Sequence, residues 1–133
     1  MANTDLMIDL ETLATSNDAA IVTMAAIRFD PHADYSKIKV EDLPPNQVMY
    51  KRIDLDSCTA LGCKVNEETI KWWATQSKEA QEEAFGDNGD RITIQEAMKE
   101  LRKFSFGVKR PWSHGSCFDL MIVDNIMRKM EIG

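Results

Sequence analysis

The first part of the chain contains three apolar segments with the lengths of β-strands. In residues 5–11, apolar positions alternate with acids, which predicts a buried strand whose carboxyl end carries Asp9 and Glu11. A second apolar run covers residues 19–29, and a loosely alternating third covers residues 47–55. Three successive strands with short connections favour an antiparallel meander.

The middle of the chain changes to a helical period. Asn66 is a good N-cap residue and is followed by two glutamates, so we expect a helix from there to Phe85. Thr93 and Glu96 have the spacing of a capping box, which predicts a second helix that continues to Phe104. The glycine- and aspartate-rich residues 86–90 separate the two helices.

A short segment, residues 110–114, leads into a final helix over residues 120–130. Apolar residues cover most of the circumference of this helix, which is typical of a helix buried on several sides. The sequence stops soon afterwards, at Gly133. We therefore expect that a covering segment is missing, or that a second copy of the chain packs against this helix or against an exposed edge of the sheet.

Composition places the chain among ordinary globular proteins. Its 133 residues are enough for one domain, 1–133, and 44% of them are hydrophobic and 29% charged. No apolar run approaches the roughly 18 residues of a membrane span, and the first residues do not resemble a signal peptide. Three cysteines are too few for a disulfide scaffold, so we expect a cytoplasmic protein without membrane contact.

Charge excludes one way of handling nucleic acid and leaves another open. The net charge is −6 and the pI about 4.9, whereas proteins that coat polyanions by counterion release are usually basic. An acidic protein can still act on nucleic acid when a few carboxylates hold divalent cations that meet the phosphates.

Asp9 and Glu11 are the first candidates for such a role. In a strand, side chains two positions apart point to the same face, so both carboxylates aim at one spot. Two converging carboxylates repel each other unless a hard cation such as Mg²⁺ or Mn²⁺ neutralises them. The alternative is a solvent-facing strand end with two ordinary acids.

The segment from His114 to Asp119 is the second candidate. Asp119 falls in the first turn of the last helix, where the helix dipole favours a carboxylate and Ser116 can act as a capping partner. Helix capping is thus the structural alternative for Asp119. For His114 taken alone, a packed or capping histidine is the alternative to a functional one.

Taken together, these segments resemble a known family. Asp9-Leu-Glu-Thr12, followed about 105 residues later by His114-Gly-Ser-Cys-Phe-Asp119, resembles the first two motifs of the DEDD (DnaQ-like) 3′–5′ exonucleases. Residues 69–76 resemble the Trp-Trp-x-x-Gln segment of the phage DexA-type branch of that superfamily. The resemblance implies an α/β, ribonuclease-H-like fold in which an antiparallel three-strand meander and one parallel strand form a mixed sheet flanked by helices.

The resemblance also implies a metal site and a reaction. Asp9 would bridge two divalent metal ions, Mg²⁺ or Mn²⁺, Glu11 would bind one of them, and Asp119 would support the site through water. The reaction would be two-metal hydrolysis of phosphodiester bonds, in which one ion prepares a hydroxide and both stabilise charge on the attacking and leaving oxygens.

Further residues would contact the substrate, the 3′ end of single-stranded DNA, with RNA as the alternative polymer. By resemblance these substrate-binding residues are Thr12, Leu13, His114 and Phe118. Trp72 and Trp73 have two interpretations, since they could stack on a base or pack in the core at helical spacing.

One part of the family pattern is absent from this sequence. The resemblance implies a third motif, in which a histidine or tyrosine precedes an aspartate on a later helix, and nothing follows Gly133 to supply it. The spacing from His114 to Asp119 imitates this motif, but using these residues twice would leave the second motif empty. We therefore expect a fold without its C-terminal part and a weakly active or inactive chain.

Two other interpretations compete with the nuclease. A zinc module could use Cys58, Cys63, His114 and Cys117. Buried structural thiols are the stronger interpretation of these cysteines, because the first spacing is at the wide end of the usual range. A non-catalytic interaction domain that retains the nuclease fold would equally explain the acidic charge and the absent third motif.

Overall fold

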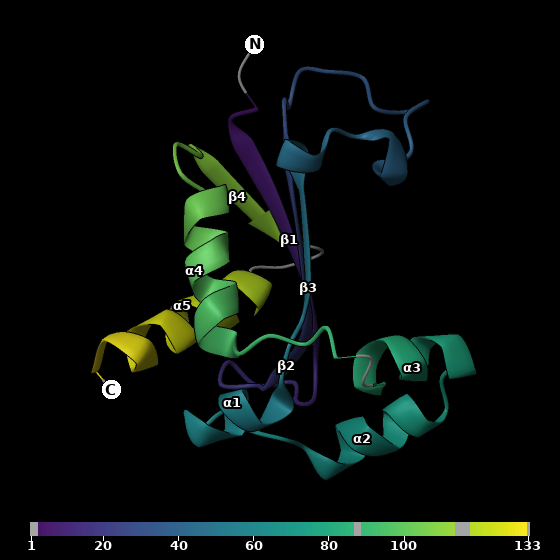
Figure 1. Cartoon of the computed structure of the whole chain (residues 1–133), viewed down its shortest axis with the longest axis vertical. Helices are drawn as coiled ribbons and strands as arrows, with labels where there is room; N and C mark the ends of the chain where they lie inside the picture. Colours follow the sequence, from purple (N-terminus) through teal and green to yellow (C-terminus); the bar gives the residue numbers. More distant parts are fainter. Residues whose placement is uncertain (1–2, 87–88, 114–117, 133) are drawn as a thin grey trace.

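The computed structural model describes residues 3–86, 89–113 and 118–132, without the side chains of residues 40, 118, 131 and 132. Its centre is a four-stranded mixed sheet (Figure 1) with the strand order β3-β2-β1-β4. The strands are β1 (Asp5–Thr12), β2 (Ile21–Phe29), β3 (Val48–Arg52) and β4 (Arg110–Ser113). β1–β2 and β2–β3 pair antiparallel, and β4 pairs parallel with β1. The predicted α/β fold, a meander extended by a parallel strand, is confirmed.

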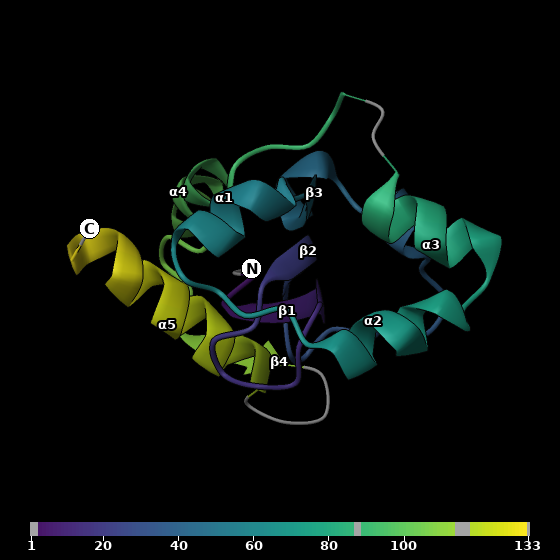
Figure 2. The ribbon, with the colours of Figure 1, turned by 90° about the horizontal axis from the view of Figure 1, so that it is seen from below.

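Helices cover both faces of the sheet. They are α1 (Leu55–Ala60), α2 (Glu67–Ala74), α3 (Lys78–Phe85), α4 (Ile94–Phe104) and α5 (Phe118–Ile132), with short 3-10 helices η1 (Val40–Asp42) and η2 (Pro45–Gln47). Figure 2 shows α1, α4 and α5 on one face and the α2–α3 pair on the other. No helix in the described part is long and apolar enough to cross a membrane.

Alternation along β1 separates the core from the polar face. The core side of β1 carries Leu6, Ile8 and Leu10, which are all buried. These residues form one cluster with buried side chains of α4 and α5, such as Met98 and Ile126. The opposite face carries Asp5, Met7, Asp9 and Glu11, so the acids of β1 project from the core as the period of two predicts.

Asp5 fixes the parallel strand in place. Its buried carboxylate accepts hydrogen bonds from Arg110 Nε at 3.1 Å, Trp112 Nε1 at 2.8 Å and Thr4 Oγ1 at 2.9 Å. Burial acts to raise the pKa of Asp5, but these hydrogen bonds together outweigh it, and the pKa lies below its ordinary value. The carboxylate is therefore a charged, fully partnered link between β1 and β4.

Two helix starts agree with the sequence prediction. Asn66 caps α2 by accepting hydrogen bonds from the backbone N–H groups of Glu68 and Thr69. Thr93 caps α4 by accepting one from Glu96. In both cases, a side-chain oxygen satisfies N–H groups that have no partner within the helix.

The prediction of one helix from residue 66 to residue 85 is wrong. α2 ends at Ala74, and α3 begins at Lys78 after its own N-cap, Ser77, which accepts a hydrogen bond from Ala80 N. The Gln81 amide bridges the break by donating to the carbonyls of Ala74 and Gln76. The third strand is also shorter than predicted, because the chain turns into α1 at Leu55.

α5 is buried along one side. Ile122, Val123 and Ile126 are buried in the main core, and Met121 is 43% exposed. The expected burial on several sides is therefore not met by the described residues.

Candidate active site

Asp9 and Glu11 begin two rows of side chains that cross the sheet. The strand register gives these rows as Asp9–Ala25–Tyr50 and Glu11–Thr23–Arg52. Because facing residues of neighbouring strands project to the same side, each acid shares its face with the β2 and β3 residues of its row. The small side chains of Ala25 and Thr23 leave a hollow between the acids and β3.

This hollow is a depression of about 270 Å³, here called the acidic depression. Asp9 and Glu11 line one side of it, and Tyr50 and Glu83 line it as well. Trp73, Ala80 and Ala84 from the α2–α3 pair complete the lining. The prediction that Asp9 and Glu11 share one face is confirmed, and both side chains are exposed.

The negative charge at this place has no compensating partner. Among described residues, neither the Asp9 nor the Glu11 side chain forms a hydrogen bond or an ion pair. Partial burial raises the pKa of Glu11 above its ordinary value, and repulsion by Asp9 and by Asp119 raises it further. The charged form of Glu11 is thus less favourable here than it is for an isolated glutamate.

Asp119 comes from the opposite end of the chain to the same place. It lies in the first turn of α5 and is 7% exposed. Its charge contributes to the raised pKa of Glu11, so the two carboxylates lie within electrostatic reach of each other. β4, which is held to β1 through Asp5, precedes α5 in the chain. The fold therefore places Asp119 within electrostatic reach of Glu11, which lines the acidic depression with Asp9.

The sequence implies divalent cations at these carboxylates. Carboxylate oxygens are the donors that Mg²⁺ and Mn²⁺ prefer, and a cation would relieve the repulsion that raises the pKa of Glu11. In their present positions, the described histidine, cysteine, aspartate and glutamate side chains include no group of three or more that could hold an ion. The donor chemistry of these carboxylates fits a divalent cation.

A second depression of about 470 Å³, here called the tryptophan recess, adjoins the first and shares Glu11 and Trp73 with it. Trp73 is buried and donates a hydrogen bond from Nε1 to the Thr12 carbonyl at 3.0 Å. Trp72 is 53% exposed, and its ring meets that of Trp73 edge to face at 5.1 Å. The two interpretations of the tryptophans thus separate, because Trp73 packs in the core and Trp72 remains open to a ligand.

The predicted substrate-binding residues have different outcomes. Thr12 lines the tryptophan recess, and its hydroxyl donates to the Ala14 carbonyl at 2.9 Å. Leu13, which the resemblance places among the substrate-binding residues, is instead only 1% exposed and packs with Trp73, so it supports the recess from within. The register shift between Glu11 and Thr12 interrupts the strand alternation just before Leu13. His114 and the Phe118 side chain lie outside the described residues.

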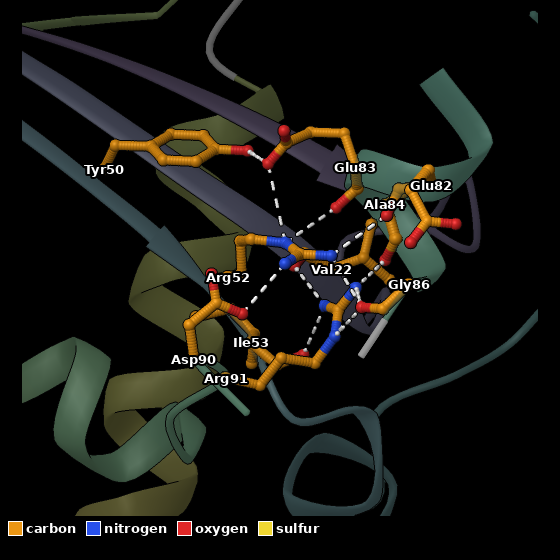
Figure 3. Close-up of polar contacts among 10 residues, drawn as sticks. All are labelled: Val22, Tyr50, Arg52, Ile53, Glu82, Glu83, Ala84, Gly86, Asp90 and Arg91. Carbon is orange, nitrogen blue, oxygen red and sulfur yellow. Dashed lines mark hydrogen bonds and ion pairs between the residues drawn. The ribbon is translucent and has the colours of Figure 1, made fainter. Parts of the chain in front are cut away.

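Tyr50 and Glu83 were missed by the sequence analysis. The Tyr50 hydroxyl donates to Glu83 Oε2 at 2.5 Å, and Arg52 Nε lies 3.5 Å from the same oxygen (Figure 3). Partial burial and the bond to Glu83 raise the pKa of Tyr50, which keeps the phenol protonated. Only knowledge of the register would have placed Tyr50 in the row of Asp9, and no sequence signal marks Glu83.

Two arginines hold α3 beside the acidic depression. Arg52 donates to the carbonyls of Glu82 and Gly86, and Arg91 donates to those of Ala84 and Gly86 (Figure 3). Carbonyls at the C-terminal end of a helix carry partial negative charge, so guanidinium groups are well suited to donate to them. The position of Glu83 is fixed by these contacts.

The described cysteines are structural. Cys58 and Cys63 are both free and buried, and Cys58 Sγ donates to the Ile21 carbonyl at 3.6 Å. Within the described part of the chain, no group of three metal-ligating side chains includes them. His114 and Cys117, the other two residues considered for zinc, lie outside the described residues.

Comparison with known proteins agrees with the fold and with the family resemblance seen in the sequence. The exodeoxyribonuclease of Enterobacteria phage T4 is 26% identical over 133 residues, which cover 96% of this chain and 57% of that protein. The chain thus spans little more than half the length of this relative. The family model of the 3′-5′ exoribonuclease Rv2179c-like domain matches residues 4–132, so the match includes every strand and helix described above. The chain belongs to this family of DnaQ-like exonuclease domains.

Proposed function

We propose that this domain removes nucleotides from the 3′ end of single-stranded nucleic acid with the help of two divalent cations, Mg²⁺ or Mn²⁺. The observation that carries the proposal is that Asp9 and Glu11 line one depression and that Asp119 lies within electrostatic reach of Glu11. Membership of an exonuclease family supports the reaction class.

Each acid has a role in this proposal. Asp9 would bind both cations, Glu11 would bind one of them, and Asp119 would support the site from α5. Bound cations of this kind activate a water molecule and stabilise charge on the attacking and leaving oxygens. Without them, the three carboxylates would repel a phosphate, so these residues also make binding of the scissile phosphate dependent on the metal.

The tryptophan recess would hold the terminal nucleoside. It shares Glu11 with the acidic depression, so a nucleoside in the recess would place its phosphate next to the carboxylates. The exposed ring of Trp72 offers a stacking surface, and such stacking contributes about 1–3 kcal/mol per base. Thr12 lies at the junction between the recess and the acids.

Single-stranded DNA is the substrate that we propose to test first. The phage T4 relative is named an exodeoxyribonuclease, whereas the family description names an exoribonuclease. Discrimination between the two polymers requires a contact to the 2′-hydroxyl group. A DNA strand and an RNA strand of the same sequence therefore form the two arms of the assay.

We also propose that residues 1–133 by themselves turn over slowly. By the resemblance, Asp9, Glu11 and Asp119 would supply the first two motifs, and the third motif, with its general base, would have no counterpart within residues 1–133. Slow hydrolysis calls for enzyme in stoichiometric amount and long incubation.

The test is a 5′-labelled single strand incubated with the protein and Mn²⁺ and resolved by length. The proposal predicts stepwise shortening from the 3′ end, which chelation of the metal and the Asp9→Asn substitution both abolish. Internal cleavage, or equal shortening by the Asp9→Asn protein, would contradict it. A strand that keeps its full length at stoichiometric enzyme would contradict it as well.

A non-catalytic interaction domain is the second candidate. The observation in its favour is that the described acids do not already form a closed ligand set. The two candidates differ in whether divalent cations bind to the folded domain.

A further inference from the structure

A third depression, of about 770 Å³, lies outside the candidate active site. Residues of β3, of η2 and of the last turns of α4 line it. Met49 and Lys51 alternate with Tyr50 along β3, so they belong to the sheet face opposite to that of Asp9 and Glu11. Figure 1 shows α4 and η2 beside β3, as this lining requires.

Positive charge predominates in this depression. It is lined by Arg28, Lys51 and Lys103 against a single acid, Glu100, in a chain with a net charge of −6. We call this depression the basic groove. Local positive charge on an acidic protein attracts anions to that place rather than to the surface in general.

The three cations differ in their mobility. The Arg28 guanidinium is fixed by the carbonyl groups of Asn3, Phe104 and Phe106, so its charge has a set position. Lys51 is half-buried and Lys103 is exposed, and neither forms an ion pair with another described residue. Both ammonium groups therefore have capacity for an external anion.

The basic groove meets the acidic depression at the edge of the sheet. β3 pairs only with β2 in the described sheet, so its outer edge presents backbone N–H groups that could also bind an anion. Tyr50 lines both depressions and is 46% exposed. A chain molecule could thus pass from the carboxylates across Tyr50 into the groove.

We propose that the basic groove binds the phosphates of nucleotides that lie on the 5′ side of the cleavage site. The identity of the ligand as single-stranded nucleic acid rests on the proposed function. The cations of the candidate active site would hold only the phosphate at the cleavage site, and the acids themselves repel the neighbouring phosphates, so a cationic surface beside the site would contribute to holding the rest of the strand. The strand crosses the edge of β3 with a base against Tyr50, and its phosphates lie at Lys51, Lys103 and Arg28.

The experiment measures binding of fluorescent single strands in the presence of chelator, so that no strand is hydrolysed. Strands of about 4 and about 16 nucleotides, as DNA and as RNA, are used to compare a ligand too short to follow the groove from Tyr50 with one long enough to do so. The test variant is Lys51→Gln combined with Lys103→Gln. The matched control is Lys39→Gln combined with Lys78→Gln, which removes the same charge outside the groove.

In the groove variant, we expect affinity for the longer strand to fall about tenfold, and the slope of affinity against salt to fall by about 1.4 for two lost phosphate contacts. The control variant should bind like the wild type, and the short strand should not distinguish the variants. Lys103→Glu alone, at an exposed position, should weaken binding of the longer strand further by repulsion and serves as a second variant if the double variant unfolds.

Equal losses in the groove and control variants would overturn the proposal. Displacement of the strand by polyglutamate at equal charge concentration would do so too, because the groove would then be a general anion site. Binding that depends on Lys51 and Lys103, combined with no hydrolysis in the separate Mn²⁺ assay, would refute the proposed reaction and leave the groove supported. Hydrolysis in the Mn²⁺ assay, combined with binding that does not depend on strand length, would refute the groove and leave the proposed reaction supported.

Discussion

The two ends of β1 carry carboxylates on the same face of one strand, in opposite surroundings. Asp5 is buried and receives hydrogen bonds from an arginine, a tryptophan and a threonine, and its pKa is lowered. Glu11 is exposed beside two further acids, and its pKa is raised. The protein supplies hydrogen-bond donors and a countercharge at Asp5, whereas none of the residues that the structure describes forms an ion pair with Glu11.

This contrast separates a structural charge from a functional one. A carboxylate whose partners are all internal holds strands together and has no capacity left for a ligand. Converging carboxylates without partners cost stability in the absence of a ligand, and groups of this kind cluster at functional sites. Substitutions at both ends of β1 test whether Asp5 and Glu11 differ in this way.

The largest effect should be on turnover. Asp9→Asn should lower hydrolysis of a single strand on the order of a thousandfold, since several kcal/mol of transition-state stabilisation depend on the cations. Asp5→Asn should leave turnover per folded molecule unchanged at a temperature where the variant is folded. Equal losses in the two variants would erase the distinction between the ends of β1.

The paired tryptophans extend the comparison to stability. Trp73→Ala should lower the free energy of unfolding by about 3–5 kcal/mol, because it removes a buried ring and the hydrogen bond to Thr12. Trp72→Ala should change it by less than about 0.5 kcal/mol, as is usual for surface positions. Denaturant unfolding measures both, and a strongly destabilised Trp72 variant would show that this ring is structural.

The two carboxylates should respond to pH with opposite signs in the metal-free protein. The folded pKa of Glu11 lies above 4.5, so its stabilising contribution is present below 4.5 and is lost as pH rises through the folded value. Glu11→Gln should therefore melt above the wild type near neutral pH, and the difference should vanish in acid.

For Asp5, the folded pKa lies below 3.8, so its contribution is present above 3.8 and is lost as pH falls through the folded value. Asp5→Asn should melt below the wild type near neutral pH, and this difference should shrink in acid. Melting curves over a pH series test both signs, and parallel profiles for the two variants would contradict the assignment.

The smallest effect should follow substitution of Glu83. This acid also lines the acidic depression, but Tyr50 and Arg52 already occupy its carboxylate. Glu83→Gln should cost about 1 kcal/mol or less in the free energy of unfolding and should leave stabilisation by Mn²⁺ intact. Loss of that stabilisation would make Glu83 a metal ligand and remove the contrast with Glu11.

Much of the fold could be predicted because local signals agreed with it. Period-two alternation located β1, and capping residues located the starts of α2 and α4. The break between α2 and α3 was missed because the apolar spacing continues across Ser77, which acts as a cap. The sequence therefore predicted which helices and strands form better than it predicted the residues at which they end.

The candidate site was predictable only where it depends on spacing within one strand. Asp9 and Glu11 follow from a separation of two residues, and the family resemblance pointed to Asp119. Tyr50 and Glu83 depend on the register of β3 and on the docking of α3 by Arg52 and Arg91, which are tertiary features. Leu13 was assigned to the substrate by the family resemblance, and its burial against Trp73 is a tertiary contact that the sequence does not mark.

The most direct test of the central claim is a Mn²⁺ titration of thermal unfolding in the wild type, Asp9→Asn and Asp5→Asn proteins. Uncompensated acids at the carboxyl end of β1 predict stabilisation of the wild type by about 2.7 kcal/mol when free Mn²⁺ reaches 100 times its dissociation constant. Asp5→Asn should gain the same stabilisation from Mn²⁺, although its melting temperature without the metal is lower. Asp9→Asn should gain little or no stabilisation. A wild type that does not respond to Mn²⁺, or an equal response in Asp9→Asn, would contradict the claim.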